Sequence, residues 1–235
     1  MKKKLLLLST CAIFLFTGCF GSKKESDNPT TISDVKIKTN NTEGLELNTY
    51  LTDNNEIILS VKNTGKEVVD YINVDVAFYD KEGNLIRTDK QYLRNMNADQ
   101  EGLVKMLLAQ YDQEGNSTLP YQIEIVLNKT IYTSKYETIY TDKVEATVSK
   151  SDTEGQLNLN VKNNSGETLD DVQIAVVFYK DSKPVDLQIA SFQSVGSTTS
   201  QEIYIPTITS GTEIKTLDYD DVKAVVNNAS KYITQ

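Results

Sequence analysis

The sequence predicts an all-β chain built as two tandem immunoglobulin-like β-sandwich domains. Two observations lead to this fold class: a long internal repeat, and short segments of alternating apolar and polar residues separated by turn residues. The composition is compatible with it, because 235 residues, 39% of them hydrophobic, suit two cores of about 100 residues each. The expected domains span residues 32–129 and 130–235.

The internal repeat returns at an offset of one hundred residues. The segment LSVKNTGKEVVDYINVDVAFY, residues 59–79, aligns without a gap with LNVKNNSGETLDDVQIAVVFY, residues 159–179. Self-similarity at a fixed offset indicates a duplicated structural unit. The identical pairs include Leu59/Leu159, Val61/Val161, Lys62/Lys162, Asn63/Asn163, Glu67/Glu167, Asp70/Asp170, Val76/Val176, Phe78/Phe178 and Tyr79/Tyr179.

The repeated unit predicts two strands joined by a turn at residues 63–66 and 163–166, where Asn, Gly and Ser gather. Strand geometry then assigns the faces, since successive side chains point to opposite sides. The predicted inward set is Ile72, Val74, Val76 and Phe78, repeated as Val172, Ile174, Val176 and Phe178; the outward set of the first copy is Asn73, Asp75, Ala77 and Tyr79.

The remaining strands follow from the same alternation between turn signals. In the first domain we expect strands at 35–39, 45–51, 56–62, 71–79, 85–94, 103–109 and 121–127. In the second we expect them at 132–141, 144–149, 156–162, 172–179, 185–193, 202–206 and 222–227. Residues 102–111 also contain good helix formers. Their counterpart in the second copy alternates like a strand, so the repeat favours a strand there, and Pro206 favours a strand end or sheet edge.

One stretch of each repeat resembles a known family. The residues Val74-Asp75-Val76-Ala77-Phe78-Tyr79-Asp80 after the VKN turn are similar to FxLYD-type modules, small immunoglobulin-like domains of bacterial surface lipoproteins. The second copy departs from the pattern at Lys180, which replaces the aspartate. The resemblance implies a β-sandwich and a surface location, and it supplies no catalytic residues.

The N-terminus has the features of an export signal. Lys2, Lys3 and Lys4 precede an apolar stretch that is too short to span a bilayer as a mature helix. The stretch ends in Phe16-Thr17-Gly18-Cys19, which is similar to a lipobox and predicts a lipid on Cys19 after removal of residues 1–18. An ordinary signal peptide with a chance cysteine is the alternative. The polar residues up to 31 predict a short flexible tether.

Lipidation of Cys19 would place the protein on the extracytoplasmic face of the cell membrane, because two or more acyl chains give stable attachment. Removal of residues 1–18 takes away three lysines and Cys11. The formal charge then changes from −9 to −12, which disfavours nucleic acid as a partner. The expected partner is the membrane, through the anchor, together with an envelope protein or glycan that the sequence does not identify.

The residue types disfavour catalysis and cofactors. The chain has no histidine, and its mature form would have no free thiol, so the commonest general bases, nucleophiles and transition-metal ligands are missing. We therefore expect no enzyme activity, no catalytic residues, no cofactor and no metal. Two acidic turns, Asp80 to Asn84 and Asp218 to Asp221, carry oxygen ligands of the kind Ca²⁺ prefers, but neither has the EF-hand pattern and both read equally well as solvated turns.

Three tyrosines are the only candidates for a binding surface. Tyr132, Tyr136 and Tyr140 stand four residues apart and would share one face of a strand. They could form an aromatic platform for a glycan or peptide. The favoured alternative is that they cover the junction between the domains, since aromatic area is commonly used in packing.

The sequence thus favours a lipid-anchored, extracytoplasmic, non-enzymatic binding, adhesion or spacer protein of the bacterial cell envelope. The alternative is an accessory subunit of a membrane transport or secretion complex. A hydrolase with an atypical site is a third class, disfavoured by the missing residue types.

Overall fold

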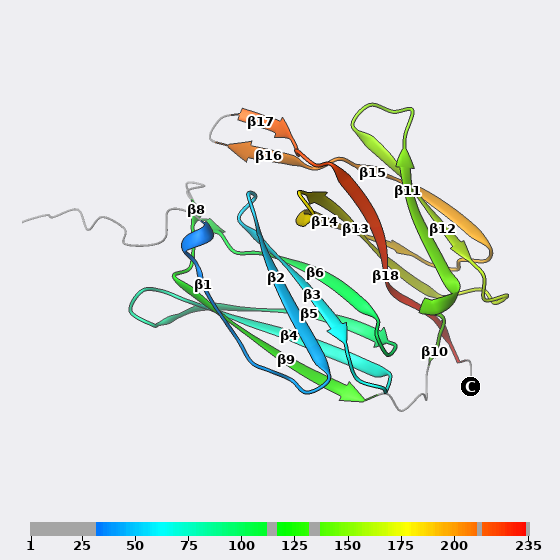
Figure 1. Ribbon diagram of the computed structural model, residues 1–235, viewed down its shortest axis with the longest axis horizontal. Helices are drawn as coiled ribbons and strands as arrows, with labels where there is room; N and C mark the ends of the chain where they lie inside the picture. The colour runs from blue at the N-terminus through cyan, green and yellow to red at the C-terminus, as the bar shows by residue number, and fades with distance from the viewer. Residues whose placement is uncertain (1–31, 112–116, 132–136, 211–212, 234–235) are drawn as a thin grey trace, which may run out of the picture.

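The computed structural model describes residues 32–111, 117–131, 137–210 and 213–233. Within these ranges the chain forms β-strands and two short 3-10 helices, and it builds two β-sandwiches that lie side by side (Figure 1). We call them the N-terminal module, with its strands between residues 36 and 131, and the C-terminal module, with its strands between 137 and 232. The predicted all-β fold class of two tandem immunoglobulin-like sandwiches is confirmed.

In the N-terminal module, one sheet has the order β1-β9-β4-β5 and the facing sheet has the order β2-β3-β6. β1 runs parallel to β9, and the other pairs are antiparallel. A small hairpin, β7-β8, lies outside both sheets. The elements are η1 (Ile32–Asp34), β1 (Lys36–Thr39), β2 (Leu45–Thr52), β3 (Glu56–Asn63), β4 (Val69–Tyr79), β5 (Leu85–Met96), β6 (Glu101–Leu107), β7 (Gln110–Tyr111), β8 (Ser117–Thr118) and β9 (Gln122–Ile131).

The C-terminal module repeats this plan. One sheet has the order β10-β18-β13-β14, the facing sheet has the order β11-β12-β15, and the hairpin β16-β17 is again separate. The elements are β10 (Glu137–Ile139), η2 (Thr141–Lys143), β11 (Val144–Lys150), β12 (Gln156–Asn163), β13 (Asp171–Lys180), β14 (Lys183–Phe192), β15 (Thr198–Tyr204), β16 (Thr207–Ser210), β17 (Glu213–Thr216) and β18 (Asp221–Tyr232).

Each module has its own core between its two sheets, and the predicted inward faces fill it. All eight residues of the predicted inward set are at most 1% exposed. They belong to two separate apolar clusters, one per module. The strand facing read from the alternation is therefore confirmed in both copies.

The predicted strands agree with the observed ones apart from a few boundaries. Residues 101–107 form the strand β6, as the repeat indicated, and β15 ends at Tyr204, before Pro206. The expected strand at 132–141 is wrong at its end, because β10 stops at Ile139. There the chain turns: the Tyr140 amide donates to the Ala229 carbonyl, and the Lys143 amide donates to the Tyr140 carbonyl in η2.

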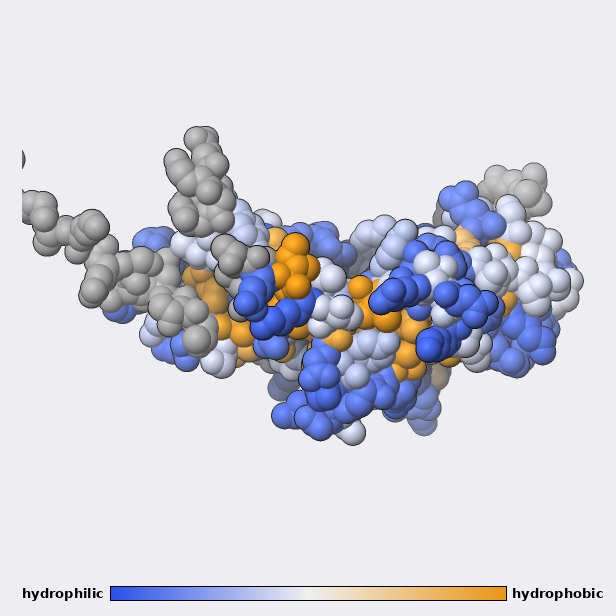
Figure 2. Space-filling model, turned by 90° about the horizontal axis from the view of Figure 1, so that it is seen from above, coloured by the Kyte–Doolittle hydropathy of each residue, from blue (hydrophilic) through white to orange (hydrophobic). Residues whose placement is uncertain are grey.

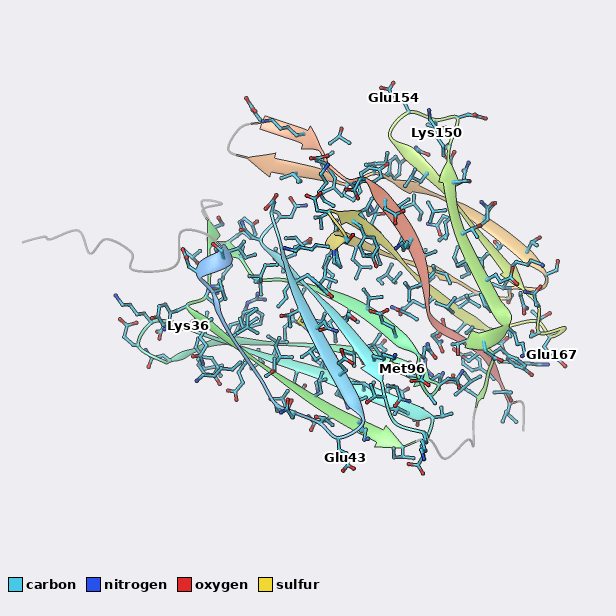
Figure 3. All side chains as sticks on the ribbon, in the orientation of Figure 1. Lys36, Glu43, Met96, Lys150, Glu154 and Glu167 are labelled. Carbon is cyan, nitrogen blue, oxygen red and sulfur yellow. The ribbon has the colours of Figure 1, made fainter. Side chains whose placement is uncertain are left out.

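The shared asparagine of the VKN turn has a structural role that the turn chemistry did not reveal. The buried Asn163 side-chain amide donates to the carbonyl oxygens of Glu167, Val195 and Gly196 at 2.7–2.9 Å, while its own oxygen accepts from the Ser165 amide. Asn63 repeats the arrangement with the carbonyls of Glu67, Met96 and Asn97 and the amide of Gly65. Figure 3 labels two of the acceptor residues, Met96 and Glu167.

The buried asparagine therefore joins the end of one sheet to the loop of the other in each module. Its own buried side-chain amide is fully hydrogen-bonded by these contacts, which explains why the two repeats share this residue.

Candidate functional site

The sequence-predicted site residues are only partly within the described structure. Cys19, Tyr132 and Tyr136 lie outside the described residues. Tyr140 follows β10 and is half-buried, and its ring packs against the core of the C-terminal module. This contact is with the core of its own module, and the expected role of the three tyrosines at the junction between the domains stays a prediction.

The acidic turns use their carboxylates in local contacts. Asp80 accepts hydrogen bonds from the backbone and side-chain amides of Asn84 at 2.7 and 2.9 Å. Asp218 pairs with Lys180 at 3.0 Å, and Asp220 accepts from the Asp181 amide. In the described part of the chain, no three His, Cys, Asp or Glu side chains come together as a metal site.

The two modules meet in a buried interface. The sheet β2-β3-β6 presents Ile58 and Leu103 to the sheet that contains β13, β14 and β18, where they meet Ala175, Val177 and Leu187. These five residues, the interface cluster, are at most 2% exposed. Tyr50, Tyr179 and Val225 pack around them. Ala175 and Val177 point away from their own module's core, so their burial depends on the other module.

An ion pair links the two modules at this interface. The Lys105 ammonium on β6 lies 2.8 Å from Asp186 of the C-terminal module and 2.9 Å from Glu56 of its own. Burial disfavours the ammonium, but the hydrogen bonds and attraction of both carboxylates outweigh it, so the pKa of Lys105 is raised. Asp186 is 2% exposed and the Lys105 side chain is 26% exposed, so the pair is largely shielded from solvent.

Polar side chains also fix the register of the two modules. The Asn227 amide donates to the Leu103 carbonyl at 2.7 Å, and its oxygen accepts from the Leu103 amide at 2.9 Å. Because β6 is an edge strand, this side chain takes the place of a neighbouring strand. Arg94 of β5 pairs with Glu137 and lies 3.6 Å from Asp171, which adds a second charged contact between the modules.

Leu187→Ala tests the contribution of the interface. We expect it to lower the free energy of unfolding by about 2 kcal/mol or more, since it leaves a cavity between the modules. The matched control is Thr88→Ala, because Thr88 holds the same register position on the N-terminal module and is exposed. We expect the control to change stability by less than about 0.5 kcal/mol. Chemical denaturation measures both, and equal effects would contradict the observed interface.

The corresponding face of the N-terminal module is uncovered. Strand register equates Asp75 and Ala77 with Ala175 and Val177, and it equates Lys90 with Ile189. This open face carries a groove of about 690 Å³. It is lined by Asp75, Val76, Ala77, Tyr79, Thr88, Asp89, Lys90, Glu124 and Val126. Its lining thus combines apolar and charged side chains, and the Lys90 ammonium lies 3.0 Å from the Asp75 carboxylate.

The outer sheet of the C-terminal module is also uncovered, and it is polar. On β11-β12-β15, register places Asn158 where the N-terminal module has Ile58, Ser200 where it has Leu103, and Glu202 where it has Lys105. The surface view shows hydrophilic residues dominating one face of the elongated molecule, with hydrophobic residues as separate patches among them (Figure 2).

Fold and interface define a two-module immunoglobulin-like sandwich protein. No family model matches the chain, and no curated protein matches it. The solved structures include the crystal structure of red sea bream transglutaminase, which aligns over 79% of this chain at 12% identity and a TM-score of 0.21. This chain spans about a third of that one, 31%. A likeness this remote carries no argument about chemistry.

Sequence reasoning missed the interface, although one signal pointed to it. Residues 174–178, Ile-Ala-Val-Val-Phe, are apolar without a break, whereas residues 74–78 alternate with Asp75. A continuous apolar run indicates a strand that is buried on both faces.

The described residues contain no helix of the length and apolarity needed to cross a membrane.

Proposed function

We propose that this protein is a lipid-anchored, non-enzymatic binding or spacer protein on the extracytoplasmic face of a bacterial cell membrane. The observation that carries the proposal is the buried interface between the modules. It joins the two sandwiches into one body, so that a binding surface on either module keeps a fixed position relative to the other module. The Lys-rich start, apolar stretch and Cys19 of the N-terminus support the anchor. The resemblance to FxLYD-type lipoprotein modules supports the location.

The arrangement of polar groups agrees with a non-enzymatic role. The adjacent carboxylates Asp170 and Asp171 are both held in structural contacts: Asp170 accepts from the Tyr232 amide, and Asp171 contacts Arg94 and Asn228. Asp221 lies 3.3 Å from Lys223 and accepts from the Val222 amide. These contacts stabilise strand ends and the interface.

Cys19→Ser tests the anchor. We expect the variant to move from the membrane fraction to the soluble fraction, because it lacks the thiol that would accept the lipid. Membrane fractionation followed by mass spectrometry of the N-terminal peptide measures this. The control is Cys11→Ser, which lies inside the segment to be removed and should leave localisation unchanged. Mutant protein that stays in the membrane with residues 1–18 removed would contradict the lipoprotein assignment.

The open face favours one second candidate, an accessory subunit of a membrane transport or secretion complex. A groove whose lining combines apolar and charged side chains has the composition of a protein interface. Purification of the anchored protein from membranes separates the two candidates, since a stoichiometric membrane partner favours the subunit.

A further inference from the structure

Three ionisable side chains, drawn from both modules, meet at the interface. The Lys105 ammonium on β6 lies 2.9 Å from the carboxyl group of Glu56 on β3 and 2.8 Å from that of Asp186 on β14. The side chains of Lys105, Glu56 and Asp186 are 26%, 19% and 3% exposed. One nitrogen therefore touches two carboxyl groups in a place that is largely shielded from solvent.

Two exposed ion pairs of similar length show how this place differs. Lys180 and Asp218 lie 3.0 Å apart with side chains that are 38% and 80% exposed. Lys90 and Asp75 lie 3.0 Å apart with side chains that are 62% and 38% exposed. Water solvates the charges of such exposed pairs and keeps them ionic. At Lys105 most of that water is excluded, and a second carboxyl group lies within reach of the nitrogen.

From this arrangement we propose that Lys105 and Asp186 condense into an amide bond that crosslinks the two modules, with Glu56 as the group that relays the proton. The bond that forms joins Lys105 Nζ to the carboxyl carbon Cγ of Asp186. The bond that breaks joins Cγ to one of its oxygens, which leaves as water. An ammonium and a carboxylate thus become one amide and one water, and the balance needs no oxidant, cofactor or second substrate.

The protons move among the three side chains. The ammonium first gives a proton to the Asp186 carboxylate along their 2.8 Å contact, which leaves a neutral amine and a neutral acid. The amine nitrogen then attacks Cγ. The Glu56 carboxylate, 2.9 Å from Nζ, takes the second proton from the nitrogen and passes it to the departing hydroxyl, which leaves as water. The third proton stays on the amide nitrogen, and Glu56 ends unchanged.

Two N–H groups already donate to the oxygens on which negative charge would develop. The Leu187 backbone amide donates to Asp186 Oδ1, and the Asn54 side-chain amide donates to Asp186 Oδ2 at 3.4 Å. Preformed donors of this kind stabilise the tetrahedral intermediate of acyl transfer. The Asp186 carboxyl group is therefore held in place for attack by the Lys105 nitrogen.

The pKa values of the two groups on the N-terminal module agree with these roles. Burial raises the pKa of Glu56, so its carboxyl group is better able to accept a proton and to return it. Burial alone would favour the neutral amine of Lys105, but the hydrogen bonds and attraction of its two carboxyl partners raise its pKa. The pair therefore rests as ions, and the first proton transfer limits the rate.

Fixed proximity offsets the cost of that first transfer. Well-oriented groups within one molecule reach effective molarities of about 10⁵–10⁸ M. The product is also neutral, so condensation removes two charges from a shielded place and relieves their desolvation penalty. Both effects favour the amide over the ion pair.

The crosslink adds a property that the proposed binding or spacer role does not contain. It would join Lys105 to Asp186, 81 positions further along the chain, and so fix the two modules to each other covalently. A disulfide cannot do this, because the two cysteines of the chain, Cys11 and Cys19, both lie near the N-terminus. Closure of a long loop restricts the unfolded chain, as a disulfide does.

Peptide mapping of the full-length chain by mass spectrometry tests the proposal. Trypsin cuts after a free Lys105 but not after an amidated one. After overnight incubation of the purified wild-type chain at neutral pH, we expect the tryptic peptides 95–129 and 181–215 to be joined. The joined pair should be lighter than the sum of the two peptides by one water. Its absence, with Lys105 recovered at the end of the peptide 95–105, would overturn the proposal.

Two variants assign the roles of the side chains. Lys105→Arg keeps a cation beside both carboxyl groups but lacks the nucleophilic amine, so the joined pair should be lost. Glu56→Gln keeps the size of the side chain but cannot relay a proton, so it should lower the joined fraction at the same time point at least about tenfold. An equal joined fraction in Glu56→Gln would overturn the relay. Circular dichroism verifies that both variants are folded, and the wild-type result does not depend on them.

Lys180 and Asp218 are the matched control within the same digest, because their contact is nearly as short but exposed. We expect them to remain unjoined, and a crosslink between them would contradict the need for a shielded site. Neither lipid nor membrane enters the experiment. Its failure would therefore leave the anchor at Cys19 untouched, and retention of the Cys19→Ser variant in membranes would leave the crosslink untouched.

Discussion

Asn163→Asp is expected to destabilise the C-terminal module by more than about 3 kcal/mol, because it turns a buried donor of three hydrogen bonds into a buried carboxylate. The side-chain amide faces the carbonyl oxygens of Glu167, Val195 and Gly196, all within 2.9 Å. A carboxylate at the same place would be repelled by all three. Urea denaturation followed by circular dichroism measures the loss.

The neighbouring Asn164 is the matched control. Its side chain is exposed and donates one hydrogen bond, to Glu145 at 2.9 Å. Asn164→Asp should therefore change stability by less than about 0.5 kcal/mol. Asn63→Asp should reproduce the large effect in the N-terminal module, since Asn63 makes the same contacts and is 0% exposed. Tolerance of both large-effect substitutions would show that the network does not hold the turn.

Phe178→Ala is expected to lower the free energy of unfolding by about 3–5 kcal/mol, the usual cost of removing a fully buried aromatic ring. The ring is 0% exposed and contacts Tyr219 edge to face, with 5.2 Å between the centroids. Its equivalent, Phe78, is 1% exposed and lies under the Arg87 guanidinium at 3.8 Å. Phe78→Ala should have a similar effect on the N-terminal module.

The tyrosines that follow these rings provide the comparison. Tyr79 lies on the open face, so Tyr79→Ala should cost clearly less than Phe78→Ala. Tyr179 occupies the equivalent position but packs at the interface, where burial, with Glu101 nearby, raises the pKa of its hydroxyl. Tyr179→Ala should therefore cost more than Tyr79→Ala. Thermal melts of the four variants measure the order, and a larger loss for the tyrosines than for the phenylalanines would reverse the assigned strand faces.

Many of the strands of each module, and the faces that they bury, could be predicted from local sequence. The alternation at Ile72, Val74, Val76 and Phe78 identifies a strand and its inward face, because the two-residue period of a strand is a property of the backbone itself. The repeat resolved residues 102–111, where helix propensity and strand pattern disagree, because duplicated units keep one fold. The strand predicted at 132–141 failed at Tyr140, where the pairing of its amide with Ala229, a long-range contact, decided the conformation.

The sequence by itself determined the all-β class, the two repeated units and the inward faces, since these follow from periodicity and self-similarity. Only the tertiary structure decided what lies on the outward faces. Ala77 and Val177 are both small apolar residues at outward positions, yet Ala77 lies in an open groove while Val177 is fully buried. The difference arises because a second module covers Val177, and burial by a distant surface leaves no period in the sequence around it.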